Sequence, residues 1–283
     1  MVQVLLGKAV ADVLTEELTE RVAKLKDRGI EPKLAIVRLG EEADDLSYER
    51  GSLNRAEKVG VKVKVYELAR DLSQEDLEQV ILDINQDDSI HGCLIFRPLP
   101  QQIDEKRIAA LLAAEKDIDG LTDGSLAGIF KGEASGFAPC TAEAAIAILK
   151  HYNVELNGAR AVVLGRSLVI GKPVAMMLLQ ENSTVTICHS RTKDIAKVAK
   201  QADVLIAAVG QAKMVNPDFC HSEQVIIDVG INVDEEGKLT GDVDYEAVEP
   251  LVKAITPVPR GVGSVTTSIL MKHVVEAAER SNE

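Results

Sequence analysis

The segment 161–179 has the pattern of a buried strand that turns through small residues into a helix. Residues 161–164 are four apolar residues that end at Gly165, and Gly171 precedes an apolar run from Val174 to Leu179. The first N–H groups of a helix lack intrahelical partners and carry partial positive charge, so such a turn can hold a nucleotide pyrophosphate. The motif reads G-R-S-x-x-x-G instead of G-x-G-x-x-G, and a purely structural turn is the alternative.

A second apolar strand, residues 184–188, is followed by Ser190, Arg191 and Lys193. In an NAD site this strand usually ends in an acidic residue that binds the ribose 2′-hydroxyl, whereas the 2′-phosphate of NADP needs donors and positive charge. Together with Arg166 in the turn, these residues favour NADP over NAD. A solvated basic loop is the alternative.

Two further apolar runs, 202–210 and 225–232, have the pattern of parallel strands that are covered on both faces. Strands alternating with helices in this way predict an α/β fold with a Rossmann-like, doubly wound parallel sheet. Ligands of such sheets bind beyond the carboxyl ends of the strands, which nominates Gly210, Gly230 and Ile231 as residues of a cofactor cleft.

Length, charge and cysteine content narrow the class of protein. The 283 residues suggest two domains, and a formal net charge of −13 argues against nucleic acid or an anionic membrane as the main partner. Apolar runs stay below the roughly eighteen residues of a membrane span, no signal-peptide pattern is present, and the histidines lack metal-ligand spacing. The cysteines are expected to be reduced core thiols of a cytoplasmic protein: Cys93, Cys140, Cys188 and Cys220.

The first half of the chain has a βα pattern of its own. Helices and strands alternate in it, with Ser73 as the expected N-cap of one helix. The expected elements are a helix over 10–25, a strand over 33–40, a helix over 45–59, a strand over 62–68, a helix over 74–84 and a strand over 93–96. The segment 135–139 separates this pattern from that of the second half and predicts the domain boundary near Pro139.

Short motifs along the chain form a recognisable series. In order they are Tyr48, Pro98-Leu99-Pro100, Lys116-Asp117-Ile118-Asp119-Gly120, Pro139-Cys140-Thr141, Gly165-Arg166-Ser167, Asp228-Val229-Gly230-Ile231-Asn232, Gly241-Asp242-Val243 and Ile255-Thr256-Pro257-Val258-Pro259. Together they closely resemble the methylenetetrahydrofolate dehydrogenase/cyclohydrolase family, over nearly the whole chain.

The resemblance implies two domains with a folate cleft between them. A folate domain would comprise 1–139, with a C-terminal helix at 265–283 packed back on it, and a Rossmann-like NADP-binding domain would comprise 140–264 and form a homodimer. The implied reactions are the NADP-dependent oxidation of 5,10-methylenetetrahydrofolate to the 5,10-methenyl form and the hydrolysis of that product to 10-formyltetrahydrofolate.

By resemblance, Tyr48 opens the catalytic helix and Asp119 binds the pterin. The family has a lysine four residues after this tyrosine and a glutamine two residues before Pro-Leu-Pro, where this chain has Ser52 and Phe96. Hydride transfer requires orientation and electrostatics, whereas hydrolysis also requires proton transfer, which neither residue performs well. The dehydrogenase activity is therefore expected to outlast the cyclohydrolase activity. Ser52 itself is expected to be a solvated helix residue.

Two further departures from the family pattern involve charge. Asp45 replaces a serine, and Arg260 replaces a glycine in the loop that contains Pro257 and Gly261. Arg260 is expected to replace the charge of the missing lysine but not its chemistry, since an arginine remains protonated. A solvated arginine is the alternative. If the loop needs a positive φ at this position, Arg260 is strained.

The sequence is thus interpreted as an NADP-dependent methylenetetrahydrofolate dehydrogenase with weak or absent cyclohydrolase activity. The expected catalytic residues are Tyr48, Ser52 and Asp119; the substrate-binding residues are Tyr48, Phe96, Asp119, Pro257, Arg260 and Gly261; the cofactor-binding residues are Gly165, Arg166, Ser167, Gly171, Ser190, Arg191 and Ile231. A fully bifunctional enzyme that uses other groups, a different two-domain α/β dehydrogenase and a non-catalytic NADP-binding regulatory protein are the alternatives.

Overall fold

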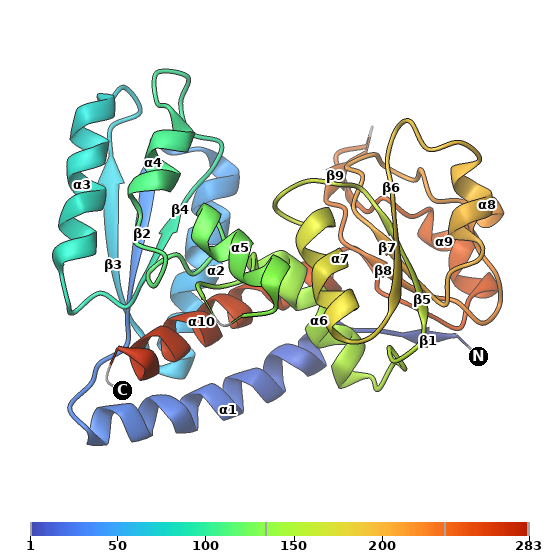
Figure 1. Cartoon of the computed structure of the whole chain (residues 1–283), viewed down its shortest axis with the longest axis horizontal. Coiled ribbons are helices and arrows are strands. Elements are labelled where there is room, and N and C mark those ends of the chain that lie inside the picture. The colour runs from blue at the N-terminus through green and yellow to red at the C-terminus, as the bar shows by residue number, and fades with distance from the viewer. Residues whose placement is uncertain (1, 134, 235, 282–283) are drawn as a thin grey trace. The chain divides into compact units, whose positions relative to one another are not determined.

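The computed structural model describes residues 2–133, 135–234 and 236–281, and the chain divides into two compact units (Figure 1). The six-stranded unit comprises Met1–Asp12 and Thr141–Thr266, and the three-stranded unit comprises Val13–Cys140 and Thr267–Glu283. The first twelve residues thus differ from the expected boundaries, which assigned all of 1–139 to one domain. The reason is that strand β1 (Gln3–Val4) pairs with strand β11 (Ala254–Ile255) of the six-stranded sheet, and no local sequence pattern predicts this pairing.

The three-stranded unit contains a parallel sheet in the order β3-β2-β4. Its strands are β2 (Lys33–Leu39), β3 (Lys62–Leu68) and β4 (Gly92–Ile95), and its helices are α2 (Ala43–Val59), α3 (Gln74–Gln86), α4 (Glu105–Leu111) and α5 (Asp123–Lys131), with most of α1 (Gly7–Asp27) and α10 (Thr266–Arg280). The predicted N-cap is confirmed, since Ser73 Oγ accepts a hydrogen bond from Asp76 N at 3.1 Å.

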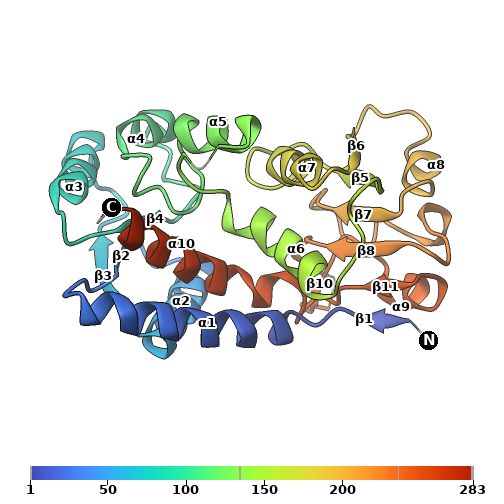
Figure 2. The same cartoon turned by 60° about the horizontal axis from the view of Figure 1, so that its bottom comes forward.

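Strand β2 is the centre of this sheet and is buried on both faces. Ala35 and Val37 pack in one apolar cluster with Ile81 of α3 and Ile108 of α4, so these helices cover one face. Leu34 and the other alternate side chains of β2 point to the opposite face, where α2 lies (Figure 2). The carboxyl ends of β2 and β4 therefore lie at one edge, followed by Gly40 and Phe96.

The six-stranded unit contains a sheet in the order β1-β11-β8-β7-β5-β6, whose paired strands are all parallel. The strands are β1 (Gln3–Val4), β5 (Arg160–Leu164), β6 (Thr184–Cys188), β7 (Val204–Ala207), β8 (Val225–Asp228) and β11 (Ala254–Ile255), beside a two-stranded ribbon of β9 (Asn232–Val233) and β10 (Leu239–Thr240). The helices are α6 (Cys140–His151), most of which is in this unit, α7 (Gly171–Gln180), α8 (Ile195–Ala199) and α9 (Tyr245–Val248). The doubly wound parallel sheet is confirmed.

The chain order reverses in the middle of this sheet. From β5 the chain passes to β6 on one side and then to β7 on the other, so β5 and β7 enclose the topological switch point, where ligands of such folds bind. Helices α6 and α7 cover one face of the sheet, and α8 and α9 cover the other (Figure 1).

Candidate active site and cofactor site

The glycine turn after β5 is built at the switch point. Gly165 has a φ of +118°, and a Cβ at this residue would lie 2.1 Å from Ala208 O, in the loop that follows β7. A Cβ at Gly171 would lie 2.4 Å from Gly165 O. Both predicted cofactor glycines are therefore required by close backbone contacts in this turn.

The start of helix α7 corrects one expectation. Its first N–H groups are not free, because Ser167 Oγ accepts from Ile170 N at 3.1 Å and from Gly171 N at 3.4 Å. Lys172 N donates to Ser167 O at 3.0 Å, and Pro173 has no N–H. In this turn, the N–H groups of residues 166–169 have no hydrogen-bond partner among the described residues. The anion-binding capacity of this turn thus belongs to its loop.

Two predicted cations and a hydroxyl follow neighbouring strands. Leu164 of β5 pairs with Cys188 of β6, so Arg166 and the pair Ser190–Arg191 leave the same edge of the sheet, all three exposed. Neither arginine has an ion-pair partner among the described residues. Hydrogen bonds within the turn, such as that from Arg191 N to His189 Nδ1 at 3.2 Å, fix its backbone. The arrangement provides charge and donors for a phosphate monoester.

Two buried aspartates, Asp228 at the end of β8 and Asp242 two residues after β10, were not among the predicted site residues. Asp242 is fully buried and accepts hydrogen bonds from the loop after β7, and Asp228 accepts from Gly230 N, Asp242 N and Val243 N, each at 3.0 Å. Burial raises the pKa of Asp228 to about 7, against these N–H donors. The sequence does signal Asp228, because an aspartate there ends an apolar run. Asp242, whose N–H donates to Asp228, lies in the Gly241-Asp242-Val243 motif. Ile231, just beyond, is 68% exposed, which is unusual for isoleucine and suits an apolar ligand surface.

In the three-stranded unit, the structure brings Tyr48 and Phe96 together. Tyr48 lies in the first half of α2 and Phe96 directly follows β4, and their rings meet edge to face with centroids 5.9 Å apart. Phe96 is buried and Tyr48 is partly exposed, so the tyrosine is the one available to a ligand.

Ser52 is fully buried, which corrects the expectation of a solvated side chain. It lies on the inner face of α2 with Glu49 and Ala56, and its Oγ has no hydrogen-bond partner in the described part of the chain. Nearby, Arg38 Nε donates to Glu49 Oε2 at 2.8 Å in a buried ion pair that the sequence reasoning also missed. Burial raises the pKa of Asp45, and the charge of Arg38 opposes this. Arg38 is thus a cation near Asp45 within this unit.

Asp119 is held by the backbone that joins the unit's last strand to α6. Asp119 Oδ1 accepts from Cys140 N at 3.1 Å. Burial raises the pKa of Asp119, while the N–H of Cys140 and the charge of Arg97 lower it. The charge of Arg97, which was not among the predicted site residues, therefore favours the ionised form of Asp119.

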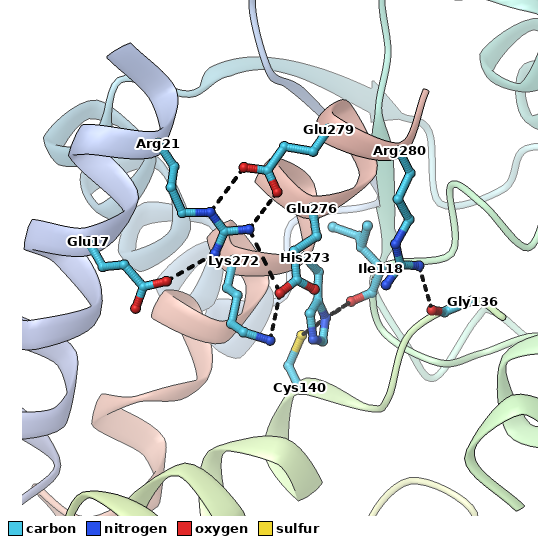
Figure 3. A network of polar contacts seen from close by, with 10 residues as sticks. All are labelled: Glu17, Arg21, Ile118, Gly136, Cys140, Lys272, His273, Glu276, Glu279 and Arg280. Carbon is cyan, nitrogen blue, oxygen red and sulfur yellow. Dashed lines mark hydrogen bonds and ion pairs between the residues drawn. The ribbon is translucent and has the colours of Figure 1, made fainter. Parts of the chain in front are cut away.

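Helix α10 fixes the segment that carries Asp119 (Figure 3). His273 Nδ1 lies 2.8 Å from Ile118 O, and Cys140 Sγ donates to the same carbonyl at 3.3 Å. On its other side α10 is bound to α1 by the bidentate pair of Arg21 with Glu279, at 3.0 and 2.6 Å. The position of Asp119 therefore depends on the C-terminal helix.

Arg260 has a φ of +80°. Because the loop does need a positive φ at this residue, the Arg260 backbone is strained, as expected for that case. Its side chain is exposed, and its charge lowers the pKa of Tyr245 in the same six-stranded unit, where burial and Glu249 raise it. No ion pair of Arg260 is present among the residues that the structure covers. Pro257 is buried, and Gly261 packs so closely that a Cβ would lie 2.4 Å from Pro257 O.

A cavity of about 920 Å³ lies elsewhere in the three-stranded unit, at the amino ends of β2 and β4. Its cations are already engaged: Lys116 Nζ donates to Ile84 O, Asn85 O and Asp87 O at 2.8–2.9 Å. None of the predicted site residues lines it. The cavity therefore does not compete with the candidate site.

Several general properties complete the description. All four cysteines are buried thiols that form no disulfide bond, as expected. Among the described residues, no helix is long and apolar enough to cross a membrane, and no group of histidine, cysteine and acidic side chains is arranged to hold a metal ion.

Comparison with known proteins identifies the family. Residues 5–119 match the model of the tetrahydrofolate dehydrogenase/cyclohydrolase catalytic domain, and residues 139–282 match that of its NAD(P)-binding domain. The chain is 54% identical to "Bifunctional protein FolD" of Clostridioides difficile over 280 residues (99% of this chain and 98% of that protein), and 53% identical to the protein of that name from Carboxydothermus hydrogenoformans over 284 residues (100% and 99%).

Solved structures agree with these relatives. The bifunctional FolD enzyme of Campylobacter jejuni has a TM-score of 0.96 at 37% identity and covers 99% of both chains. The Trypanosoma brucei enzyme, solved with NADP cofactor and an inhibitor, has a TM-score of 0.93 at 34% identity and covers 100% of this chain and 99% of its own. The expected nicotinamide cofactor is thus confirmed by the NAD(P)-binding domain and by this NADP-containing neighbour. The chain belongs to the tetrahydrofolate dehydrogenase/cyclohydrolase family of enzymes.

Proposed function

We propose that this protein oxidises 5,10-methylenetetrahydrofolate to 5,10-methenyltetrahydrofolate with NADP as the hydride acceptor, and that its cyclohydrolase activity is weak or absent. The proposal of weak or absent cyclohydrolase activity rests on the environment of residue 52. Ser52 is fully buried one helical turn after Tyr48, and Phe96 packs on Tyr48 where the family has a glutamine. The site thus has aromatic surface but no amine or amide for proton transfer at these two positions.

The described residues fit NADP. The free N–H groups of 166–169 suit the pyrophosphate, and Arg166, Ser190 and Arg191 suit the 2′-phosphate. Exposed Ile231 offers an apolar surface at the carboxyl end of β8. The bound cofactor accepts the hydride, and the protein contributes orientation and electrostatics.

For the folate, we propose binding residues in each unit taken by itself. Tyr48 and Asp119 would bind the pterin end, with Phe96 packed against Tyr48, and the carboxyl group of Asp119 would accept hydrogen bonds from pterin N–H groups. Within the six-stranded unit, the proposed substrate-binding residues are Pro257, Arg260 and Gly261, and Arg260 would supply positive charge toward an anionic substrate. Hydride leaves the methylene carbon with the help of the neighbouring nitrogen lone pairs, so this step needs no proton transfer at carbon.

Hydrolysis has different requirements. Water must be activated at the methenyl carbon, and a ring nitrogen must be protonated as the adduct opens. The loss of such a proton-transfer group typically lowers the rate by about 10²–10⁴-fold. The relatives are named bifunctional, and this chain differs from the family pattern at the two positions that serve hydrolysis. The regulatory alternative is not favoured, because enzymes match the chain over its full length.

We further propose a cytoplasmic homodimer formed through the six-stranded unit. Strand β6 is an edge strand of the sheet, and Ile187 on it and Leu179 on α7 are 36% and 55% exposed. An open strand edge with apolar neighbours is typical of an interface. Light scattering tests this proposal: Ile187→Lys should convert a dimer into a monomer, and a monomeric wild-type protein would contradict it.

The dehydrogenase activity is tested by mixing the protein with methylenetetrahydrofolate and either NADP or NAD and recording reduction of the nucleotide. We expect reduction with a higher kcat/KM for NADP. Tyr48→Phe keeps the ring that packs on Phe96 but removes the hydroxyl, and should lower kcat, with the thermal midpoint measured to show that the variant remains folded. Failure of the wild type to reduce either nucleotide in the presence of the folate would contradict the proposal.

A further inference from the structure

The carboxylate of Asp242 gathers the loops that follow two parallel strands. Asp242 Oδ2 accepts from Val209 N at 2.6 Å and Gly210 N at 3.0 Å. Asp242 Oδ1 accepts from Gln211 N at 2.9 Å and Asn232 Nδ2 at 3.0 Å. Loop 208–211 follows β7 and loop 229–232 follows β8, and we call these two segments the edge loops.

The edge loops are packed around this carboxylate with no spare room. A Cβ at Gly230 would lie 2.4 Å from Asp242 Cγ, so the second loop passes directly against it. Asp242 is fully buried and carries no ligand-facing surface of its own. Its four accepted hydrogen bonds use both oxygens, which is the full capacity expected of a carboxylate in this geometry.

The first edge loop continues into the cofactor turn. Ala208 directly precedes the three residues whose N–H groups donate to Asp242. Its carbonyl oxygen lies so close to Gly165 that a Cβ there would be only 2.1 Å from it. The second edge loop carries exposed Ile231 between Gly230 and Asn232. Asp242 is therefore connected to both parts of the proposed cofactor site. Through Val209 and Ala208 it holds the loop that contacts the glycine turn at Gly165, and through Asn232 it holds the loop that carries Ile231.

We propose that Asp242 is a positioning residue for the nicotinamide cofactor, whose carboxylate holds the edge loops in the arrangement that receives the nicotinamide half. This inference rests on the proposed cofactor site. The residues proposed to bind the 2′-phosphate, Arg166 and Arg191, follow β5 and β6, whereas the edge loops follow β7 and β8. Loss of the Asp242 carboxylate should therefore affect binding of the whole dinucleotide but leave recognition of the 2′-phosphate in place.

Asp242→Asn is the most direct test. An amide has one acceptor oxygen and one N–H₂ donor, so in either orientation two of the four N–H groups face a donor. We expect calorimetric titration with NADP, below the unfolding transition, to give a Kd raised about tenfold or more, since lost and unsatisfied hydrogen bonds of this kind change an equilibrium by at least that factor. Titration with 2′-AMP, which carries the 2′-phosphate but no nicotinamide half, should give the wild-type Kd.

Asp244→Asn is the matched control. It makes the same substitution two residues away, at an aspartate whose side chain makes no hydrogen bond within the described residues, and its Kd for NADP should stay within about twofold of wild type. Asn232→Ala removes one of the four bonds and should raise the Kd less. The double variant should bind no more weakly than Asp242→Asn alone, because the two residues share one interaction.

A folded Asp242→Asn protein with the wild-type Kd for NADP would overturn the inference, and so would an equal loss of affinity for NADP and 2′-AMP, which indicates general damage to the unit. If Asp242→Asn does not fold, Asn232→Ala decides: an unchanged Kd for NADP overturns the inference. A wild-type protein that binds methylenetetrahydrofolate but not NADP would overturn both the inference and the proposed function. A wild type that binds NADP without dehydrogenase activity would overturn the proposed function alone.

Discussion

The edge of one aromatic ring meets the face of another between Tyr48 and Phe96, with centroids 5.9 Å apart and an interplanar angle of 81°. Such pairs contribute about 0.5–1.5 kcal/mol beyond the area they bury, so Phe96 stabilises the position of Tyr48. Phe96 cannot donate or accept a proton. Under the proposed function, the residue that orients the tyrosine also leaves hydrolysis without a proton relay at this position.

Restoring hydrolysis should require two changes. Ser52→Lys alone introduces an amine at a fully buried position without a partner, so it should lower the free energy of unfolding by about 1–3 kcal/mol and add little cyclohydrolase activity. Ser52→Lys with Phe96→Gln should increase the rate of methenyl hydrolysis above that of either single variant. Stopped-flow absorbance of the methenyl compound measures this rate.

Ser52→Met with Phe96→Gln is the control for bulk, since methionine matches much of the length of lysine without its amine. It should not hydrolyse the methenyl compound faster than wild type. Equal activation by the lysine and methionine variants would exclude the proposed role of proton transfer.

The choice of cofactor should depend on Arg166. Arg166→Ala removes a charge that faces the proposed 2′-phosphate, and a charged hydrogen bond of about 1.5–3 kcal/mol corresponds to a loss of roughly ten- to a hundredfold in kcat/KM for NADP. The value for NAD should change little. Arg160→Ala is the matched control, because Arg160 begins the same strand and pairs with Asp203 at 3.1 Å, at the opposite edge of the sheet. An equal fall for NADP and NAD in Arg166→Ala would show that the 2′-phosphate assignment is wrong.

Asp228 should give the stability a distinctive pH dependence. Its pKa is raised to about 7, so the folded protein binds a proton that the unfolded chain releases at a lower pH. The stabilising contribution of this proton is fully present at low pH and is lost as the pH rises through about 7, by at most about 1.4 kcal/mol per pH unit. The difference in free energy of unfolding between wild type and Asp228→Asn should therefore shift against the wild type between about pH 4 and pH 7, as denaturant titrations can measure. A difference that is constant over this range would contradict the assignment.

Arg260→Gly should separate strain from function. Glycine adopts the φ of +80° without a steric penalty, so the variant should be more stable by about 1 kcal/mol. If Arg260 supplies charge toward the substrate, the KM for the folate should rise in the same variant. Chemical denaturation and steady-state kinetics measure the two effects. A more stable protein with an unchanged KM would identify Arg260 as a solvated side chain.

Local patterns predicted much of the fold. The strand 62–68 and the cap at Ser73 agree with the structure, and the glycine turn at 165 was recognised because a strand, small residues and a helix follow one another directly. The pairing of β1 with β11 joins residues about 250 positions apart, and no periodicity encodes it.

The candidate site shows the same limit. Arg166, Ser190 and Arg191 could be nominated from the sequence because each follows a recognisable strand, and their role in cofactor binding stays a prediction. The burial of Ser52, the Arg38–Glu49 ion pair and the four bonds of Asp242 depend on which faces and loops meet in three dimensions. A polar residue between apolar neighbours indicates that the residue is buried. The sequence does not show which group that residue will contact.

The most direct test of the account is to follow the methenyl intermediate itself. Purified protein is mixed with methylenetetrahydrofolate and NADP, and the absorbances of NADPH and of 5,10-methenyltetrahydrofolate are recorded together. We expect the two absorbances to rise in equal molar amounts and the methenyl compound then to decay at close to the rate measured without protein. A methenyl compound that decays in proportion to protein concentration, at a rate comparable to its formation, would contradict the account.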